Sequence, residues 1–330
     1  MKILVSEIEA VAASALEAHG AGGFQAAEVA RAVARAEATG NIICGLYYLE
    51  SYCIQLASGR VDGRAEPVVT RPRPGAVLSD AMSGFAQPAF ARGRDMAIAA
   101  ARDCGTASFA VTRAHTCTSV GYFTEQIAKA GLIAIGCTNA SHIVVPPGGH
   151  SRTIGTNPIA MTVPGPEGPR MHFDFSTSAV ALGKITMAKA AGEPIPLGWA
   201  VDAEGNPTDD PAKALEGGLV SAGGYKGWAL GLMVELLAAG VAGGVNSLDA
   251  AGLKLADGPP HHLGQFYLLI DPGQFGDTFD ARFERVAAAV AEQEGARIPG
   301  AGRRGKTEVE VPDALWALAG SLAGGPAHKG

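Results

Sequence analysis

The stretch Pro158-Ile-Ala-Met-Thr-Val163, Pro164-Gly-Pro-Glu-Gly-Pro169, Arg170-Met-His-Phe-Asp-Phe-Ser176 decides between the possible fold classes. Its two apolar, β-branched and aromatic runs, 158–163 and 170–176, predict two strands. The six residues between them are too few for the crossover that parallel neighbours require. We therefore expect an antiparallel hairpin, which excludes a doubly wound sheet built only from parallel strands.

Helical and strand patterns extend on both sides of this hairpin. Residues 6–58 show helical periodicity, with Ile8, Val11, Ala12 and Leu16 on one face. Further helices are predicted at 88–104, 120–130, 226–243 and 278–293, and strands at 108–111, 132–137 and 265–271. We expect an α/β fold with a mixed, largely antiparallel sheet. A buried helix at 226–243, the strand at 265–271 and the helix at 278–293 would complete its core.

The composition excludes several classes of protein. A chain of 330 residues with 47% apolar and 18% charged residues is typical of a globular enzyme. Its net charge of -6 gives no attraction to nucleic acid or to an anionic membrane. The five cysteines are widely spaced without Cys-x-x-Cys, so we expect neither a metal site nor a disulfide framework. No signal peptide is recognisable, and the apolar stretch 228–245 contains Glu235, so we expect a cytoplasmic protein without a membrane span.

Residues 300–307, Gly-Ala-Gly-Arg-Arg-Gly-Lys-Thr, match the phosphate-loop pattern G-x-x-x-x-G-K-[ST]. A working phosphate loop needs a buried strand before it and a helix after it, so that amides surround the phosphates. Here an extended run follows and stops at Pro312. We interpret the segment as a basic surface loop. Since no G-x-G-x-x-G follows a predicted strand, a dinucleotide would have to bind without that fingerprint.

Four signatures punctuated by glycine and proline follow one another between residues 147 and 227. They are Pro147-Gly-Gly149 with Gly155-Thr-Asn-Pro158, Asp174-Phe-Ser-Thr-Ser178 with Gly183-Lys184, Ile195-Pro-Leu-Gly-Trp199-Ala-Val-Asp202, and Gly223-Gly-Tyr-Lys226-Gly227. The series resembles the malate/L-lactate dehydrogenase type 2 family over nearly the whole chain. This resemblance implies a homodimeric oxidoreductase that transfers hydride between NADH or NADPH and a small acid, without a Rossmann domain.

The resemblance also implies a set of cofactor contacts. They are Thr116, Cys117, Thr118, Ser119, Asp174, Phe175, Ser176, Tyr225, Lys226, Arg303 and Arg304. Hydroxyls at 116, 118 and 119, before a helix at Val120, suit a pyrophosphate, although an ordinary helix cap explains each of them equally well. Lys226 at the start of an apolar helix favours a ligand contact, because a charge there needs a partner. We expect a helical substrate and dimer domain (1–75 with 295–330) and a cofactor-binding sheet domain (76–294).

The catalytic positions are where this chain departs from the family. The family motif Ser-His-Gly-x-x-Arg, with a tyrosine four residues later, reads Ile43-Cys44-Gly45-Leu46-Tyr47-Tyr48 here, and Tyr52 is in place. In the family the histidine donates a proton and the arginine binds the substrate carboxylate. A cysteine thiol is a weak hydrogen-bond donor, so Cys44 is a poor copy of histidine. We still assign Cys44 and Tyr48 to the reaction centre.

Three functions remain open on these residues. A protonated imine needs no acid during reduction, and Tyr48 and Tyr52 offer rings to a cation, so a cyclic imine or imino acid is a suitable substrate. Alternatively, Lys184 or His115 replaces the missing donor in an ordinary 2-hydroxy acid dehydrogenase; burial of Lys184 beside apolar residues would suit that role. The third possibility is a cofactor-binding pseudo-enzyme. The expected substrate contacts are Tyr52, Thr156, Asn157, Leu182 and Gly183, although a plain turn also explains the loop at 155–158.

Overall fold

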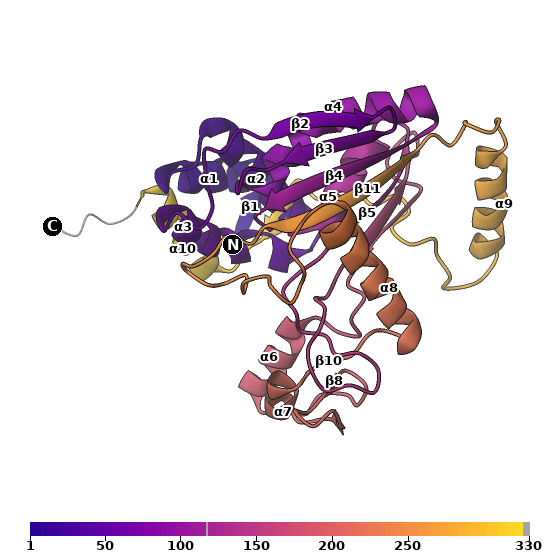
Figure 1. Cartoon of the computed structure of the whole chain (residues 1–330). Helices are drawn as coiled ribbons and strands as arrows, with labels where there is room; N and C mark the ends of the chain where they lie inside the picture. Colours follow the sequence, from indigo (N-terminus) through magenta and orange to yellow (C-terminus); the bar gives the residue numbers. More distant parts are fainter. Residues whose placement is uncertain (117, 326–330) are drawn as a thin grey trace.

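The computed structural model describes residues 1–116 and 118–325, with a seven-stranded sheet at its centre (Figure 1). In spatial order its strands are β2 (Val68–Arg73), β3 (Ala76–Asp80), β4 (Thr106–Ala114), β11 (Leu263–Ile270), β5 (Ile133–Thr138), β6 (Ile159–Val163) and β7 (Met171–Phe175). The predicted hairpin is confirmed, because β6 and β7 pair antiparallel with Ile159 opposite Phe175. Among the sheet's described strands, β3 and β4 alone pair in parallel. The fold is the mixed, largely antiparallel α/β class that the sequence predicts.

Strands β2 and β3 were not predicted. β2 is an edge strand that contains Pro72 and is exposed at most positions, so it lacks the apolar alternation of a half-buried strand. The helix α4 (Ala86–Cys104) connects β3 to its parallel neighbour β4, as a parallel pair requires. This connection explains why one parallel pair occurs in an otherwise antiparallel sheet.

The core of the sheet is aromatic and lies under two helices. Here α4 and α5 (Val120–Ala128) cover the face on which Phe90, Phe109, Phe123 and Tyr267 are fully buried. The rings of Phe90 and Phe123 lie 4.8 Å apart between centroids. A Cβ on Gly93 would stand 2.6 Å from the Phe109 ring, so only glycine lets α4 approach the sheet this closely.

The two ends of the chain form one helical unit. The helices α1 (Val5–Ala18), α2 (Gly23–Ala38), α3 (Leu49–Ala57) and α10 (Asp313–Ala323) share a core with the two-stranded pair β1 (Lys2–Leu4) and β12 (Glu308–Glu310). Ile8, Leu16 and Tyr52 are fully buried in it. Residues 300–307 begin in a turn and lead into the strand β12 and not into a helix, which confirms that they are no phosphate loop.

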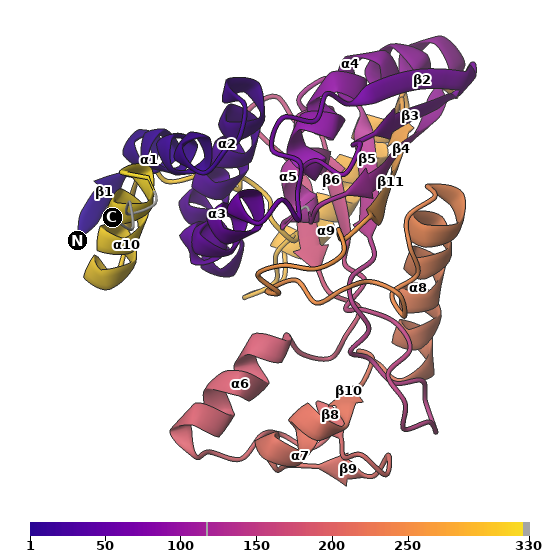
Figure 2. The same cartoon turned by 60° about the vertical axis from the view of Figure 1, so that its left-hand side comes forward.

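A small lobe carries its own core below the sheet (Figure 2). It consists of α6 (Leu182–Ala191), α7 (Pro211–Glu216) and the three-stranded sheet β8 (Ala200–Val201), β9 (Pro207–Thr208) and β10 (Gly218–Leu219). Asp210 caps α7 by accepting hydrogen bonds from the backbone of Ala212 and Lys213. The signature at 195–202 and the Gly183-Lys184 end of the signature before it lie in this lobe.

Two helices differ from their predicted burial. The helix α8 (Tyr225–Glu235) and the π-helical turn η3 (Leu236–Val241) lie against the sheet, yet Leu232, Met233, Leu236 and Val241 are exposed. The stretch is apolar on both faces, and the sheet covers only one of them. The prediction of a fully buried helix was wrong.

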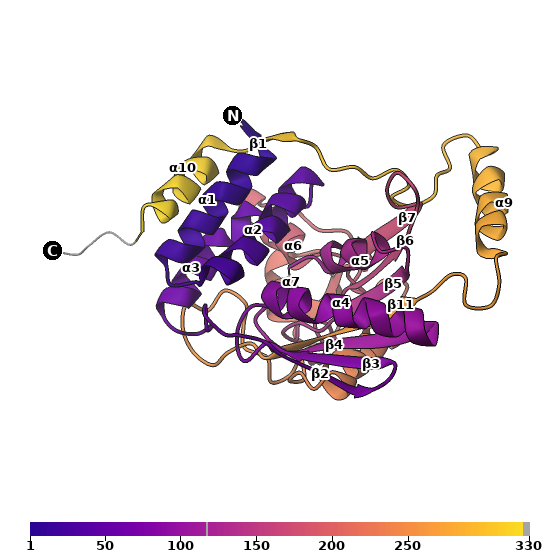
Figure 3. The ribbon, with the colours of Figure 1, turned by 90° about the horizontal axis from the view of Figure 1, so that it is seen from above.

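The helix α9 (Phe279–Ala291) has no buried residue and stands apart from the sheet (Figure 3). The Arg170 guanidinium, 2.8 Å from Asp280, is a described link between α9 and the body. The position of α9 in the chain was predicted correctly, but its predicted place in the core was wrong. Amphipathic spacing shows that a helix has an apolar face, but it does not show which part of the protein packs against that face. The two-domain division (1–75 with 295–330, and 76–294) stays a prediction; β2, within the first part, pairs with the sheet of the second.

Candidate active site

A continuous row of rings joins the helical unit to the sheet. Tyr48, in the 3₁₀ turn η2 (Leu46–Tyr48), stacks on Tyr52 of α3 with 6.2 Å between centroids. Tyr52 in turn meets the edge of Phe85 at 5.6 Å and of His115 at 6.3 Å. The row therefore brings the predicted catalytic residues Tyr48 and His115 together with Tyr52, a predicted substrate contact.

His115 is the buried end of this row. Its Nε2 hydrogen-bonds Gln55 Oε1 at 2.8 Å, and its ring stacks on His261 at 4.5 Å. Its Nδ1 has no hydrogen-bond partner among the described residues. Burial first, then the His261 ring and the Arg60 charge, hold the pKa of His115 well below 6.5. The imidazole is therefore neutral near pH 7, which argues against the predicted role of His115 as a proton donor.

Cys44 lies at the opposite side of the row, at the end of the 3₁₀ turn η1 (Ile42–Cys44), and is half-buried. Burial, reinforced by the Asp174 carboxylate, raises the pKa of its thiol to about 12, against a weaker opposing hydrogen bond with Asn41. The pKa of Tyr48 is also raised to about 12, by burial and then by its neighbours Cys44 and Tyr47. Both groups thus stay protonated and are weak acids at physiological pH.

Asp174, on β7, brings two of the predicted cofactor segments together. Its Oδ2 accepts hydrogen bonds from Ser119 Oγ at 2.7 Å and from the Gly121 amide at 2.8 Å, at the start of α5. The Ser119 hydroxyl is thus engaged by a carboxylate that caps the helix, and its contact with a pyrophosphate stays a prediction. Thr116 is buried and Thr118 has a φ of 64°, whereas Cys117 lies outside the described residues.

The chain beyond Asp174 forms an open surface with the start of α8. Ser178 bridges to Ser221, which brings the segment of Phe175 and Ser176 beside that of Tyr225 and Lys226. Phe175 is 51% exposed, Ser176 is half-buried and Tyr225 is 70% exposed.

This surface suits a ligand with both planar and anionic parts. The Ser221 Oγ is buried and has no partner among the described residues, and an unsatisfied buried hydroxyl is an unfavourable feature without a ligand. Two exposed rings and the Lys226 ammonium lie on neighbouring segments. A nicotinamide dinucleotide has this chemistry. Lys226 itself is exposed, and its predicted contact with a ligand stays a prediction.

The two predicted substrate contacts in the loop before β6, Thr156 and Asn157, differ in their burial. Asn157 is fully buried, and its Nδ2 donates to the Gly231 carbonyl and to Glu235 Oε2, both at 3.0 Å. Its Oδ1 accepts from the Ala140 amide at 3.3 Å. The side chain of Asn157 thus joins the loop to α8, and its contact with substrate stays a prediction. Thr156 is half-buried, and its carbonyl accepts from Thr177.

The predicted substrate contacts Leu182 and Gly183, and the predicted proton donor Lys184, lie on the small lobe. Leu182, Gly183 and Lys184 open α6 and are all exposed. The Lys184 ammonium stands 5.9 Å from the Trp199 ring centroid, within the same lobe. The expected burial of Lys184 was wrong, since Ile185 is the residue of this helix that is buried in the lobe's core, and the Lys184 side chain is left exposed.

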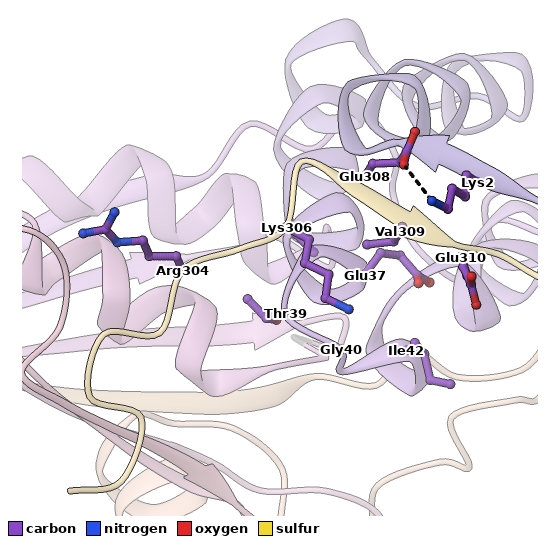
Figure 4. Close-up of a pocket in the computed structure, with 11 residues that line it drawn as sticks. Lys2, Glu37, Thr39, Gly40, Ile42, Arg304, Lys306, Glu308, Val309 and Glu310 are labelled. Carbon is purple, nitrogen blue, oxygen red and sulfur yellow. Dashed lines mark ion pairs between the residues drawn. The ribbon is translucent and has the colours of Figure 1, made fainter. Parts of the chain in front are cut away.

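Arg304, one of the two arginines predicted to contact the adenosine end of the cofactor, lines a separate pocket of ≈ 570 Å³. Its lining residues include Glu37, Ile42, Lys306 and Glu308, and none of the rings of the aromatic row. Figure 4 shows Arg304 pointing away from the ion pair of Lys2 with Glu308. The Arg304 guanidinium pairs instead with Glu167 at 2.7 Å. Arg303 is half-buried and helps, after burial, to lower the pKa of His172.

Several residues of this site were missed by sequence reasoning. Gln55, Arg60 and His261 surround His115, and Lys254 places its Nζ 2.5 Å from Tyr47 Oη. They come from positions up to about two hundred residues apart, so no local pattern connects them. The one available signal was His261-His262 directly before a predicted strand.

Comparison with known proteins identifies the family. A model of the family described as malate/L-lactate dehydrogenase matches residues 3–317. The chain belongs to the malate/L-lactate dehydrogenase family. It is therefore an oxidoreductase, and a resemblance to this family already follows from the four signatures.

Relatives within the malate/L-lactate dehydrogenase family act on two kinds of substrate. The chain is 40% identical to the (2R)-3-sulfolactate dehydrogenase (NADP(+)) of Chromohalobacter salexigens, covering 95% of both chains. It is 36% identical to the Delta(1)-pyrroline-2-carboxylate reductase of Ancylobacter novellus, covering 96% of both. The crystal structure of delta1-piperideine-2-carboxylate reductase from Pseudomonas syringae is similar with a TM-score of 0.90 and 33% identity, covering 98% of this chain and 99% of that one.

Two further findings concern this family member's described residues. No helix in residues 1–116 and 118–325 is both long and apolar enough to cross a bilayer. Within the same residues, no group of three or more histidine, cysteine, aspartate or glutamate side chains is arranged to hold a metal ion.

Proposed function

We propose that this chain is an NADH- or NADPH-dependent reductase of a small cyclic imine that carries a carboxylate next to the C=N bond. The observation that carries the proposal is the lack of a strong acid among three predicted catalytic residues, Tyr48 and His115 in the aromatic row and Cys44 beside it. The pKa values of Cys44 and Tyr48 are raised to about 12, and that of His115 is held well below 6.5. None of these groups is a good general acid near pH 7.

The chemistry of an imine suits such a site. A protonated imine already carries the proton on nitrogen, so addition of hydride to its carbon yields a neutral amine without any further proton. A ketone in the same place would become an alkoxide and would require an acid. The nicotinamide cofactor supplies the hydride when bound. The chain's own part is to exclude water with the rings of Tyr48 and Tyr52 and to hold the substrate beside them.

Residues of the open surface support binding of the dinucleotide. Phe175 and Tyr225 offer exposed rings, Ser221 an unpartnered hydroxyl and Lys226 a cation for phosphate. The relative from Chromohalobacter is named for NADP(+), and two cations, Lys226 and Arg303, are available near the predicted cofactor segments. We propose NADH or NADPH as the cofactor on this chemistry.

A second candidate is dehydrogenation of a 2-hydroxy acid. The 40% identical relative named as a sulfolactate dehydrogenase favours it. In that case the site must deliver a proton that Cys44, Tyr48 and His115 are poorly suited to give.

We further propose a cytoplasmic homodimer. Support for the dimer comes from the exposed apolar face of α8 and η3, because a surface of this kind is typical of a subunit contact. Support for the location comes from the five widely spaced cysteines, a pattern that suits a reducing compartment.

The deciding experiment measures oxidation of NADH and NADPH by the purified protein at 340 nm with a panel of substrates. We expect kcat/KM for Δ1-pyrroline-2-carboxylate and Δ1-piperideine-2-carboxylate to exceed that for pyruvate, oxaloacetate and 3-sulfopyruvate by at least about tenfold. A preference for an oxo acid would support the second candidate. Cofactor binding, followed by NADPH fluorescence, without turnover of any substrate would indicate a pseudo-enzyme.

A further inference from the structure

The ammonium group of Lys254 lies beside Tyr48, at one end of the aromatic row. Lys254 Nζ lies 4.1 Å from the ring centroid of Tyr47 and 5.7 Å from that of Tyr48. It also donates a hydrogen bond to Tyr47 Oη at 2.5 Å. Such contacts hold a cation by attraction to the ring faces. The side chain is exposed, so the ammonium is accessible to a molecule that enters from solvent.

The backbone on both sides of Lys254 is held by buried side chains. Gln55 Nε2 donates to the carbonyls of Leu253 and Leu255 at 2.5 and 2.9 Å. Arg60 donates to the Leu255 carbonyl at 2.6 Å and to that of Gly252 at 2.9 Å. Gln55 and Arg60 are both nearly inaccessible to solvent. A loop residue fixed on both sides by buried groups is preorganised, which lowers the entropy that binding costs.

The same Gln55 connects this loop to the other end of the row. Its Oε1 contacts His115 Nε2, while its Nε2 holds the two carbonyls that flank Lys254. One buried amide thus fixes both His115 and the loop. The distance from Lys254 to the row is therefore set by the packed core and not by a free loop.

Lys254 has no carboxylate partner among the described residues, because no ion pair within 4.0 Å includes it. An ammonium has three N–H donors, and the Tyr47 hydroxyl takes one. Two donors are left for a ligand. A carboxylate is the group that gains most from such donors, since charge-assisted hydrogen bonds are stronger than neutral ones.

We propose that Lys254 binds the carboxylate of the substrate and selects imines that carry one. The inference rests on the proposed function, since it places the carboxylate of a cyclic imino acid beside Tyr48. The C=N bond then faces Tyr48, and the carboxylate faces the ammonium. Lys254 supplies from a distant loop the positive charge that position 48, a tyrosine, lacks.

The test compares two substrates that differ only in the carboxylate. For Lys254→Met we expect KM for Δ1-pyrroline-2-carboxylate to rise by about 10- to 100-fold, the range of a charge-assisted contact, with kcat changed less than about threefold. KM for 1-pyrroline, which lacks the carboxylate, should not change. Lys254→Arg should restore most of the affinity. An unchanged KM in Lys254→Met, or an equal rise for both substrates, would overturn the proposal.

Two control variants separate binding from structure. Lys213→Met removes a lysine from the small lobe and should leave both KM values unchanged. Tyr47→Phe removes the phenol that holds Lys254 but keeps the ammonium, so it should raise KM by less than Lys254→Met. An effect of Tyr47→Phe as large as that of Lys254→Met on both substrates would indicate a structural role for the pair.

A binding measurement keeps the inference independent of turnover. Calorimetry with pyrrole-2-carboxylate, a planar carboxylate of the same size, should detect binding to the wild-type protein saturated with NADPH and at least tenfold weaker binding to Lys254→Met. If this difference appears although no imine is reduced, the proposed function fails and the carboxylate site stands. If the wild-type protein does not bind pyrrole-2-carboxylate, the carboxylate site is wrong.

Discussion

At the scale of single residues, the site combines reactive positions with groups that do not ionise near neutral pH. Cys44 is neutral because burial and the charge of Asp174 both oppose its thiolate. Tyr48 is neutral because burial opposes its phenolate. A thiol and a phenol held in this state can pack against a substrate and accept or donate weak hydrogen bonds, but they contribute little acid catalysis.

Restoring the family's groups at positions 44 and 48 should change the substrate preference. The double variant Cys44→His/Tyr48→Arg supplies an acid and a carboxylate clamp, and we expect kcat/KM for 2-oxo acids to rise by at least about tenfold relative to cyclic imines, because a positioned acid contributes about 10²–10⁴. Steady-state assays on both substrate classes measure this ratio. Cys104→His, on the exposed end of α4, is the matched control. An unaltered ratio in the double variant would contradict the assignment of these positions.

The buried histidines should make the protein sensitive to acid. Burial, then the charge of Arg60, lowers the pKa of His261 to about 4, below its unfolded value of about 6.5. The full stability is present above about pH 6.5. It is lost as the pH falls from about 6.5 to about 4, because the unfolded state then binds the proton first. One such group contributes up to about 3 kcal/mol.

We expect the free energy of unfolding of His261→Phe to fall less between pH 7 and pH 4.5 than that of the wild-type protein. Urea unfolding at the two pH values measures the difference, and phenylalanine preserves the stacking on His115. His150→Phe, at an exposed position, should leave the pH dependence unchanged. Identical slopes for His261→Phe and the wild-type protein would show that His261 does not titrate in this way.

At the scale of elements, a buried carboxylate connects three segments around α8. Glu235 accepts hydrogen bonds from Asn157 Nδ2, from the Ser247 amide and hydroxyl, and from Asn246 Nδ2. A charged group in an apolar helix is tolerated because its oxygens are satisfied in this way. This network holds Asn157 in the Gly155-Thr-Asn-Pro158 loop, where it adopts a φ of 37°.

Removing Asn157 should therefore cost stability. We expect Asn157→Ala to lower the free energy of unfolding by about 1–3 kcal/mol, because it leaves the Glu235 carboxylate with one donor fewer in a buried place. Urea unfolding measures the change. Asn206→Ala, in an exposed turn, should alter stability much less. A loss of activity at unchanged stability would instead support the original prediction of a substrate contact.

At the scale of the whole molecule, the exposed apolar face of α8 and η3 predicts a contact with a second subunit. Leu232, Met233 and Leu236 share the exposed face of α8 and η3, and we expect this face to be buried in the proposed homodimer. Leu232→Asp combined with Leu236→Asp should shift the protein from dimer to monomer in size-exclusion chromatography with light scattering, since a charge in an apolar contact is strongly unfavourable. Val286→Asp, on the exposed part of α9, is the control. A wild-type protein that elutes as a monomer at micromolar concentration would contradict the dimer.

The sequence by itself determined the antiparallel hairpin of β6 and β7, the helices α4, α5 and α9, and the false phosphate loop at 300–307. These features depend on apolar period, glycine and proline within a short stretch, and neighbouring residues are enough to specify them. It also indicated that positions 48, 52 and 115 belong to one site, through the resemblance of its motifs.

The tertiary structure alone decided how those residues behave. It decided that Lys184 is exposed, that Asn157 hydrogen-bonds Glu235 and that Lys254 lies over Tyr47. Such contacts join segments that are as many as 207 positions apart in the chain. The same holds for the pKa of His115, which follows from the stacking of His261 and from burial under α3. Burial and charge are properties of packed surroundings, and those surroundings arise only when distant segments fold against one another.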